Sequence, residues 1–176
     1  MIKVTSNDNF VKKQIIELLF QKNIHVDMDH KYLSFVQMIV DVENSKKINL
    51  LINDKNYFFL LPMNFDDFYK NLLYLLSAIN IQKGQINFYP FKEEVIYKDK
   101  SVKLKHIHHK IFVEAIRNPD GIDKTTLYQK IWPLDKEVSI NKIDTHLTNL
   151  KNFLLDELGY KLNFKSSSQK LVLNFD

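Results

Sequence analysis

Three histidines within four residues, His106, His108 and His109, are the most reactive side chains that stand close together in this sequence. Two histidines three positions apart can share one face of a helix and bind the same metal ion. The chain has no cysteine, and no carboxylate completes a ligand set beside these histidines. We therefore expect surface histidines, and neither a metal site nor another cofactor.

A second polar cluster combines His25 and His30 with Asp27 and Asp29. A hydrolase or nucleotide-binding enzyme would also need a nucleophile motif or a glycine-rich turn that holds phosphate. We find neither, and the whole chain has only three glycines. The sequence therefore predicts a protein that is not an enzyme.

A segment from about 139 to 158 combines apolar and polar side chains at helical spacing. Ile143, Leu147, Leu150 and Leu154 recur at steps of three and four, and Gly159 is suited to end the helix. A solvated face of an ordinary helix would show the same pattern. Opposite this stripe lie donors and acceptors of the kind that contact base edges and phosphates. They are Asn141, Lys142, Thr145, His146, Thr148, Asn149, Lys151 and Asn152.

The elements around this helix could place it in a DNA groove. We expect short strands at 86–91, 95–97 and 101–104, helices at about 105–117 and 124–132, and a closing hairpin from 160 to 175. Strands, three helices and a hairpin are the order of a winged helix-turn-helix, whose hairpin reaches the DNA backbone. The expected contacts at the hairpin tip are Lys165, Ser167, Ser168 and Lys170.

The formal net charge of +4 is concentrated in the same half. Residues 86–176 carry 14 Lys and one Arg against 12 Asp and Glu, whereas residues 1–85 carry 10 Lys against 9 Asp and Glu. A net charge of this size fits both a nucleic-acid binder and an ordinary lysine-rich protein, and its distribution slightly favours a nucleic-acid partner for this half. Arg117 is the only arginine, so contacts must come mainly from Lys, Asn, Thr, Ser and His.

Two motifs in this half resemble the effector domain of OmpR/PhoB-type response regulators. One is Leu127-Tyr128-Gln129-Lys130-Ile131-Trp132-Pro133, and the other is the hydrophobic-Asp-x-His-hydrophobic-x-x-Leu-basic run within Asn141 to Lys151. The resemblance covers about residues 86–176. It implies sequence-specific binding of double-stranded DNA, regulation of transcription, and a loop (Pro133 to Val138, with Asp135, Lys136 and Glu137) that could contact RNA polymerase.

The chain departs from that family in three places. His108 stands where the family usually has a glutamate, Lys151 stands where an arginine usually follows the recognition-helix leucine, and the hairpin tip lacks a Gly-Tyr pair. These changes affect DNA sequence preference more than the fold. The target sequence therefore does not carry over from the family.

Residues 1–80 predict strands at 2–5, 24–26, 32–42, 48–52 and 57–61, with helices at about 10–19 and 64–79. This order predicts an α/β layer with a parallel sheet, and 81–85 is expected as a linker. The half is similar to a shortened receiver domain, but Leu61 stands where the phosphate-binding lysine belongs. Asp41 is the only acid placed to accept a phosphoryl group, so we expect a regulator that works without phosphorylation.

The expected fold is thus an α/β receiver-like domain (1–80) followed by an α+β winged helix-turn-helix domain (86–176). The helix at 64–79 has more apolar side chains than a small sheet can cover, which predicts a homodimer. No apolar run reaches the roughly 20 residues of a membrane span, and we expect a cytoplasmic protein without a membrane partner. A phosphorylation-dependent response regulator and a protein-interaction module are alternatives. The expected dimer contacts are Phe65, Phe68, Tyr69, Leu72 and Leu76.

Overall fold

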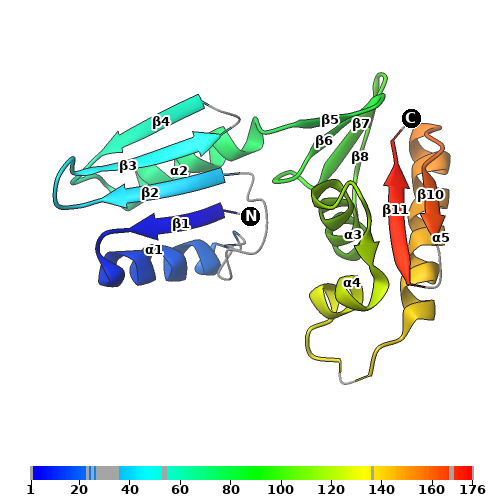
Figure 1. Ribbon diagram of the computed structural model, residues 1–176. Coiled ribbons are helices and arrows are strands. Elements are labelled where there is room, and N and C mark those ends of the chain that lie inside the picture. The colour runs from blue at the N-terminus through cyan, green and yellow to red at the C-terminus, as the bar shows by residue number, and fades with distance from the viewer. Residues whose placement is uncertain are drawn as a thin grey trace. The chain divides into compact units, whose positions relative to one another are not determined.

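The computed structural model describes residues 2–22, 24, 26, 36–52, 55–135, 137–166 and 169–175. The chain divides into two compact units, Met1–Leu76 and Ser77–Asp176, each with its own core. In Figure 1 the first unit runs from blue to green-cyan and the second from green to red. No helix among the described residues is long and apolar enough to cross a bilayer.

Among its described residues, the first unit holds one mixed sheet and two helices (Figure 1). Its elements are β1 (Ile2–Ser6), α1 (Asn9–Gln21), β2 (Val36–Asp41), β3 (Lys47–Ile52), β4 (Lys55–Leu60) and α2 (Phe65–Ser77). The strands lie in the order β1-β2-β3-β4. Burial alternates along β2 and β3, so one face of the sheet belongs to the core and the other is open.

Local sequence explains where the two helices begin. The Asp8 carboxylate accepts hydrogen bonds from the backbone N–H groups of Phe10 (2.8 Å) and Val11 (3.1 Å), which caps α1. At α2 the Asn64 side chain accepts from the backbone of Asp66 at 2.8 Å, and acids occupy the first turn. α2 then packs on the sheet, since the ring of Phe68 meets that of Phe59 edge to face at 5.2 Å.

The parallel sheet predicted for this half is wrong for two of its three strand pairs. β1 and β2 are parallel, but β2 with β3 and β3 with β4 are antiparallel. The connections explain this, because the few residues between these strands suffice for hairpins and cannot hold a crossover helix. The sheet therefore differs from the parallel 2-1-3-4-5 order of receiver domains. Within 24–26, the segment expected to form a strand, Val26 makes one parallel bridge with Ile2.

The dimer surface predicted on α2 is also wrong in part. Phe68, Leu72 and Leu76 are at most 3% exposed, so they form the stripe that holds α2 on the sheet. Phe65 and Tyr69 are half-buried, and their rings stack on each other at 6.3 Å. The sheet covers more of this helix than its composition suggested.

In the part of the second unit that the structure describes there are two sheets and three helices (Figure 1). In chain order these are β5 (Ile81–Lys83), β6 (Ile86–Tyr89), β7 (Glu94–Tyr97), β8 (Lys100–Lys103), α3 (His106–Arg117), β9 (Ile122–Asp123), α4 (Lys124–Ile131), α5 (Ile140–Leu158), β10 (Asn163–Ser166) and β11 (Lys170–Asn174). The first sheet is antiparallel in the order β5-β6-β7-β8, and the second has the order β10-β11-β9.

The segment 81–85, expected as a linker, forms β5 and its turn. Ile81 pairs with Phe88 and Lys83 with Ile86, and only Gly84 and Gln85 connect the two strands. Gly84 has φ 55°, a conformation that glycine adopts without strain. The sequence did not predict this short strand, because Ile81-Gln82-Lys83 contains only one strongly apolar residue.

Gly121, between α3 and β9, should be the glycine least able to tolerate a side chain. It has φ 99°, and a Cβ there would lie 2.6 Å from Cγ2 of Val172 and 3.0 Å from the carbonyl of Leu171. We expect Gly121→Ala to lower the free energy of unfolding by about 2–4 kcal/mol, because strain in the left-handed backbone and overpacking both contribute. Gly159 has φ 72°, but a Cβ there would meet nothing within 4 Å, so Gly159→Ala should cost only about 1 kcal/mol. Equal urea midpoints for the two variants would contradict this assignment.

Candidate nucleic-acid interface

α5 is the longest helix of the second unit. Its buried side chains and its C-terminal cap fix its orientation within that unit. Ile143, Leu147, Leu150, Leu154 and Leu158 are at most 4% exposed, as their spacing predicted. Gly159 ends the helix with φ 72°, and its N–H donates to the carbonyl of Leu155 at 2.9 Å. The opposite face of the helix is therefore held toward the outside of the unit.

From Asn141 to Asn152 that outer face carries an uncharged stripe, here called the polar stripe, and the exposed Asp156 continues the same arc one turn further on. At 3.6 residues per turn its members lie within an arc of about 100°, and all are exposed. Thr145 and Thr148 donate their hydroxyl protons to the carbonyls of Asn141 (2.9 Å) and Asp144 (3.0 Å), which leaves oxygen lone pairs free to accept. The polar stripe consists of Asn141, Thr145, Thr148, Asn149 and Asn152.

Two residues predicted to contact DNA lie instead on the flank of α5 that meets the end of α4. Nζ of Lys142 is 3.1 Å from Oδ2 of Asp135 and 4.1 Å from the centre of the Trp132 ring. The ring of His146 lies 5.4 Å from that of Trp132. Both side chains are half-buried. These contacts hold α5 in place and leave only part of each side chain accessible to a ligand.

His108 lies next to His146 in the core, so the expectation of surface histidines is wrong here. Its ring centre is 6.3 Å from that of His146 and 5.9 Å from that of Phe153, and it is only 6% exposed. Burial, His146 and Lys105 lower the pKa of His108, while burial and Lys142 lower the pKa of His146. Both rings are therefore held neutral at pH 7.

These lowered pKa values predict that acid destabilises the second unit. As the pH falls through the usual histidine range near 6.5, the unfolded chain binds protons before the folded chain does, so the free energy of unfolding should decrease from pH 7.5 to pH 5.5. Urea unfolding at several pH values measures this slope. Replacing both His108 and His146 by Gln should flatten it, and a slope that the double variant leaves unchanged would refute the assignment.

His109 and His106 complete the cluster that could have bound a metal. His109 is also buried, and its Nε2 lies 2.8 Å from the carbonyl of Pro90, while Glu93 lies 3.7 Å from Nδ1. His106 is exposed. Among the described residues, no group of three His, Asp or Glu side chains could hold a metal ion. His25, His30, Asp27 and Asp29 lie outside the described residues.

Three ion pairs, which the sequence did not predict, form two clusters that link α4 to α5 and α3 to α4. Nζ of Lys124, at the start of α4, lies 2.8 and 3.0 Å from the two carboxylate oxygens of Asp144 on α5. Glu114 on α3 contacts Arg117 at 3.4 Å and Lys130 on α4. Arg117, the only arginine, is 8% exposed. It therefore serves the core and not a ligand surface.

The closing hairpin of β10 and β11 supplies the remaining predicted contacts. Lys165 and Lys170 are exposed, whereas Ser167 and Ser168 lie outside the described residues. Nζ of Lys151 lies 6.0 Å from the ring centre of Phe164, so this lysine joins α5 to β10. The hairpin thus presents basic side chains on the same unit as the polar stripe.

The loop between α4 and α5 is partly fixed. The hydroxyl of Tyr128 donates to Asp135 at 2.7 Å, and this bond, with that from Lys142, lowers the pKa of Asp135. Leu134 is 92% exposed, and Glu137 is exposed as well. Lys136 lies outside the described residues.

Asp41, the predicted phosphoryl acceptor, caps the turn that follows β2. Its carboxylate accepts from the backbone N–H of Asn44 (3.1 Å), the backbone N–H of Ser45 (3.0 Å) and the Ser45 hydroxyl (2.8 Å). The bond from Asn44, followed by those from Ser45, lowers the pKa of Asp41 to about 2. Asn7 adds a further hydrogen bond at 3.1 Å. This carboxylate therefore has a structural role in the turn.

Comparisons with known protein families and with curated proteins found no match for this sequence.

Proposed function

We propose that the second unit is a winged helix-turn-helix that binds double-stranded DNA, and that the protein is a cytoplasmic transcription regulator rather than an enzyme. The order of elements supports this proposal, with an antiparallel sheet, three helices and a hairpin following one another. In this arrangement α5 is the recognition helix and the β10–β11 hairpin is the wing.

The observation that carries the proposal is the polar stripe on α5. A helix with its side chains is about 10–12 Å across and enters a major groove about 12 Å wide. The side-chain amides of the stripe both donate and accept, as base edges require, and its threonine hydroxyls can accept. Between Asn141 and Asn152 the arc holds no carboxylate that would repel phosphate. Lys165 and Lys170 on the wing supply positive charge that can contact the phosphates of the DNA backbone.

The first unit supports a role in dimerisation and not in phosphoryl signalling. Asp41 is engaged in its turn by three bonds, and Leu61 cannot provide the charge of a phosphate-binding lysine. We therefore propose that DNA binding does not depend on phosphorylation. The exposed Leu134 and Glu137 in the α4–α5 loop would then remain accessible to RNA polymerase.

Substitutions on the helix and on the wing should have different effects on DNA binding. Asn149→Ala removes one base contact and should relax preference at one position by about 1–3 kcal/mol, while Lys170→Ala should weaken binding to all sequences alike. Selection of bound sequences from a random duplex library, followed by affinity measurements, separates the two. If Lys170→Ala changed only specificity, the roles of helix and wing would be assigned wrongly.

A further inference from the structure

The sheet of the first unit has two edges, and they differ. On the outer side of β1, Val26 forms a parallel bridge with Ile2. Among the residues that the structure describes, no strand pairs with the outer side of β4. Every second residue of such an edge presents an N–H and a C=O that can pair with another strand. β4 is therefore the edge at which the sheet can be extended.

Apart from Lys55 at its first position, β4 lacks the features with which proteins usually protect such an edge. From Asn56 to Leu60 it has no charge and no proline, and its register with β3 runs without a bulge from Lys55 to Leu60. Two of the three side chains on its open face are apolar, since Phe58 is 65% and Leu60 is 66% exposed, and the third is the uncharged Asn56. The strand is thus suited to accept a partner strand.

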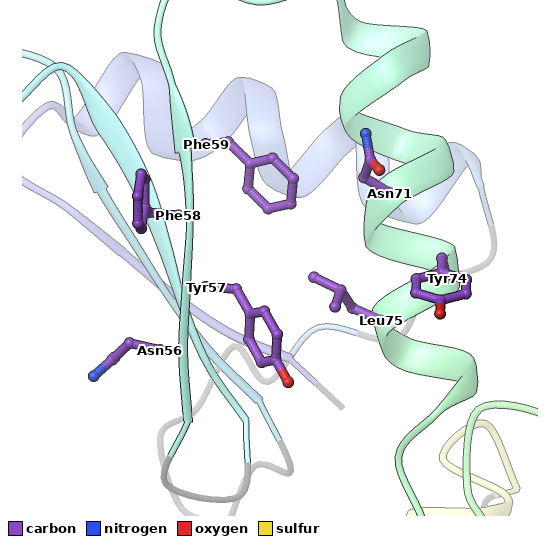
Figure 2. A pocket seen from close by; sticks show the side chains of 7 residues that line it. All are labelled: Asn56, Tyr57, Phe58, Phe59, Asn71, Tyr74 and Leu75. Carbon is purple, nitrogen blue, oxygen red and sulfur yellow. The ribbon is translucent and has the colours of Figure 1, made fainter.

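A cavity beside this edge would accommodate the side chains of an added strand. Figure 2 shows Tyr57 and Phe59 pointing from β4 toward α2, whereas Asn56 and Phe58 point to the other side. The space between β4 and α2 has a volume of about 410 Å³ and is bounded on the helix side by Asn71, Tyr74 and Leu75. Tyr74, at its rim, is 74% exposed.

We propose that a second copy of this chain occupies the edge, with β4 pairing antiparallel to the partner's β4 around a two-fold axis at Phe58. Antiparallel pairing of identical strands is self-complementary, as a two-fold interface requires. In this register Phe58 meets its own copy on the open face, where aromatic cross-strand pairs stabilise a sheet. The two four-stranded sheets would become one sheet of eight strands.

The chemistry of the edge favours a second copy over a charged peptide. In the register centred on Phe58, Tyr57 lies opposite Phe59 of the copy on the cavity side, and Asn56 lies opposite Leu60. No charged residue meets its own copy, because the nearest charge, Lys55, falls opposite the apolar Leu61. A charged peptide would find a single charge on the strand, that of Lys55 at its first position.

The available area fits a weak dimer. Large side chains bury about 150–250 Å² each, so the exposed parts of Phe58, Leu60 and Tyr74, with the strand backbone, amount to on the order of 600 Å² per copy. Specific interfaces begin near 1,200 Å² in total. We therefore expect dissociation in the micromolar range. The role of such a dimer rests on the proposed function, because a dimer would present two recognition helices to DNA.

Sedimentation equilibrium of the full chain without DNA tests the interface separately from DNA binding. The parent should be a dimer at tens of micromolar, and Phe58→Glu should raise the dissociation constant at least tenfold. The matched control is Phe10→Glu, a change at a 72% exposed residue of α1 that should leave the dimer intact. Circular dichroism melting would verify that both variants fold.

A cross-linking experiment locates the axis, since the chain has no cysteine of its own. Phe58→Cys should form a disulfide-linked dimer under mild oxidation, because opposite Cβ atoms of paired strands lie close to disulfide distance. Phe10→Cys should not. A parent that stays monomeric, a dimer that survives Phe58→Glu, or cross-linking equal at both positions would overturn the proposal, whatever the DNA measurements show.

Discussion

Asp144→Ala is expected to destabilise the second unit by about 2–3 kcal/mol, the largest effect we predict for one side chain of the helical core. The variant leaves the Lys124 ammonium group, whose side chain is 4% exposed, without the two oxygens that lie 2.8 and 3.0 Å away. Loss of one partner of a buried pair usually costs more, about 3–5 kcal/mol, but the Asp144 side chain is 44% exposed and water weakens the pair.

The matched control removes the other partner. Lys124→Met keeps the volume in the core and takes away the buried charge, so it should change the free energy of unfolding by less than about 1 kcal/mol. Urea unfolding of both variants measures the difference. If Lys124→Met were as destabilising as Asp144→Ala, the pair would contribute through its mutual attraction and not through the cost of an unpaired buried lysine.

The second large effect concerns salt. Between about 50 and 200 mM salt, the affinity for duplex DNA should fall by about a hundredfold or more, because four phosphate contacts with a slope of about −0.9 each already give that change. Docking on a protein generally lacks so steep a slope. The candidate donors are the exposed lysines of the second unit, Lys92, Lys98, Lys100, Lys103, Lys105, Lys161, Lys165 and Lys170.

Periodicity predicted the helices well because it reports which side chains must be buried. The stripe from Ile143 to Leu158 and the caps at Asp8 and Gly159 are local features, and the structure contains all of them. The direction of the strands in the first unit depends instead on which strands pair. Apolar runs such as Ile48–Ile52 look alike in parallel and antiparallel sheets, and only the short connections held information about direction.

The details of the candidate interface likewise depend on contacts between residues that are far apart in the sequence. A helical wheel places Lys142, His146 and the polar stripe on the same non-core side of α5, but it does not show that Trp132 and Asp135 cover one flank of that side. The partner of the buried Lys124 lies 20 residues away in sequence, and no local pattern identifies it. The open edge at β4 likewise follows from the strand order.

The most direct test of the central claim is a charge placed on the polar stripe. We predict that Thr148→Glu weakens binding of the full chain to sheared genomic duplex DNA by at least about a hundredfold at 50 mM salt, because the new carboxylate would face phosphate and base acceptors. Gln14→Glu adds the same charge to an exposed position of α1 and should change affinity less than about twofold. Full-strength binding by Thr148→Glu would show that α5 does not enter the DNA.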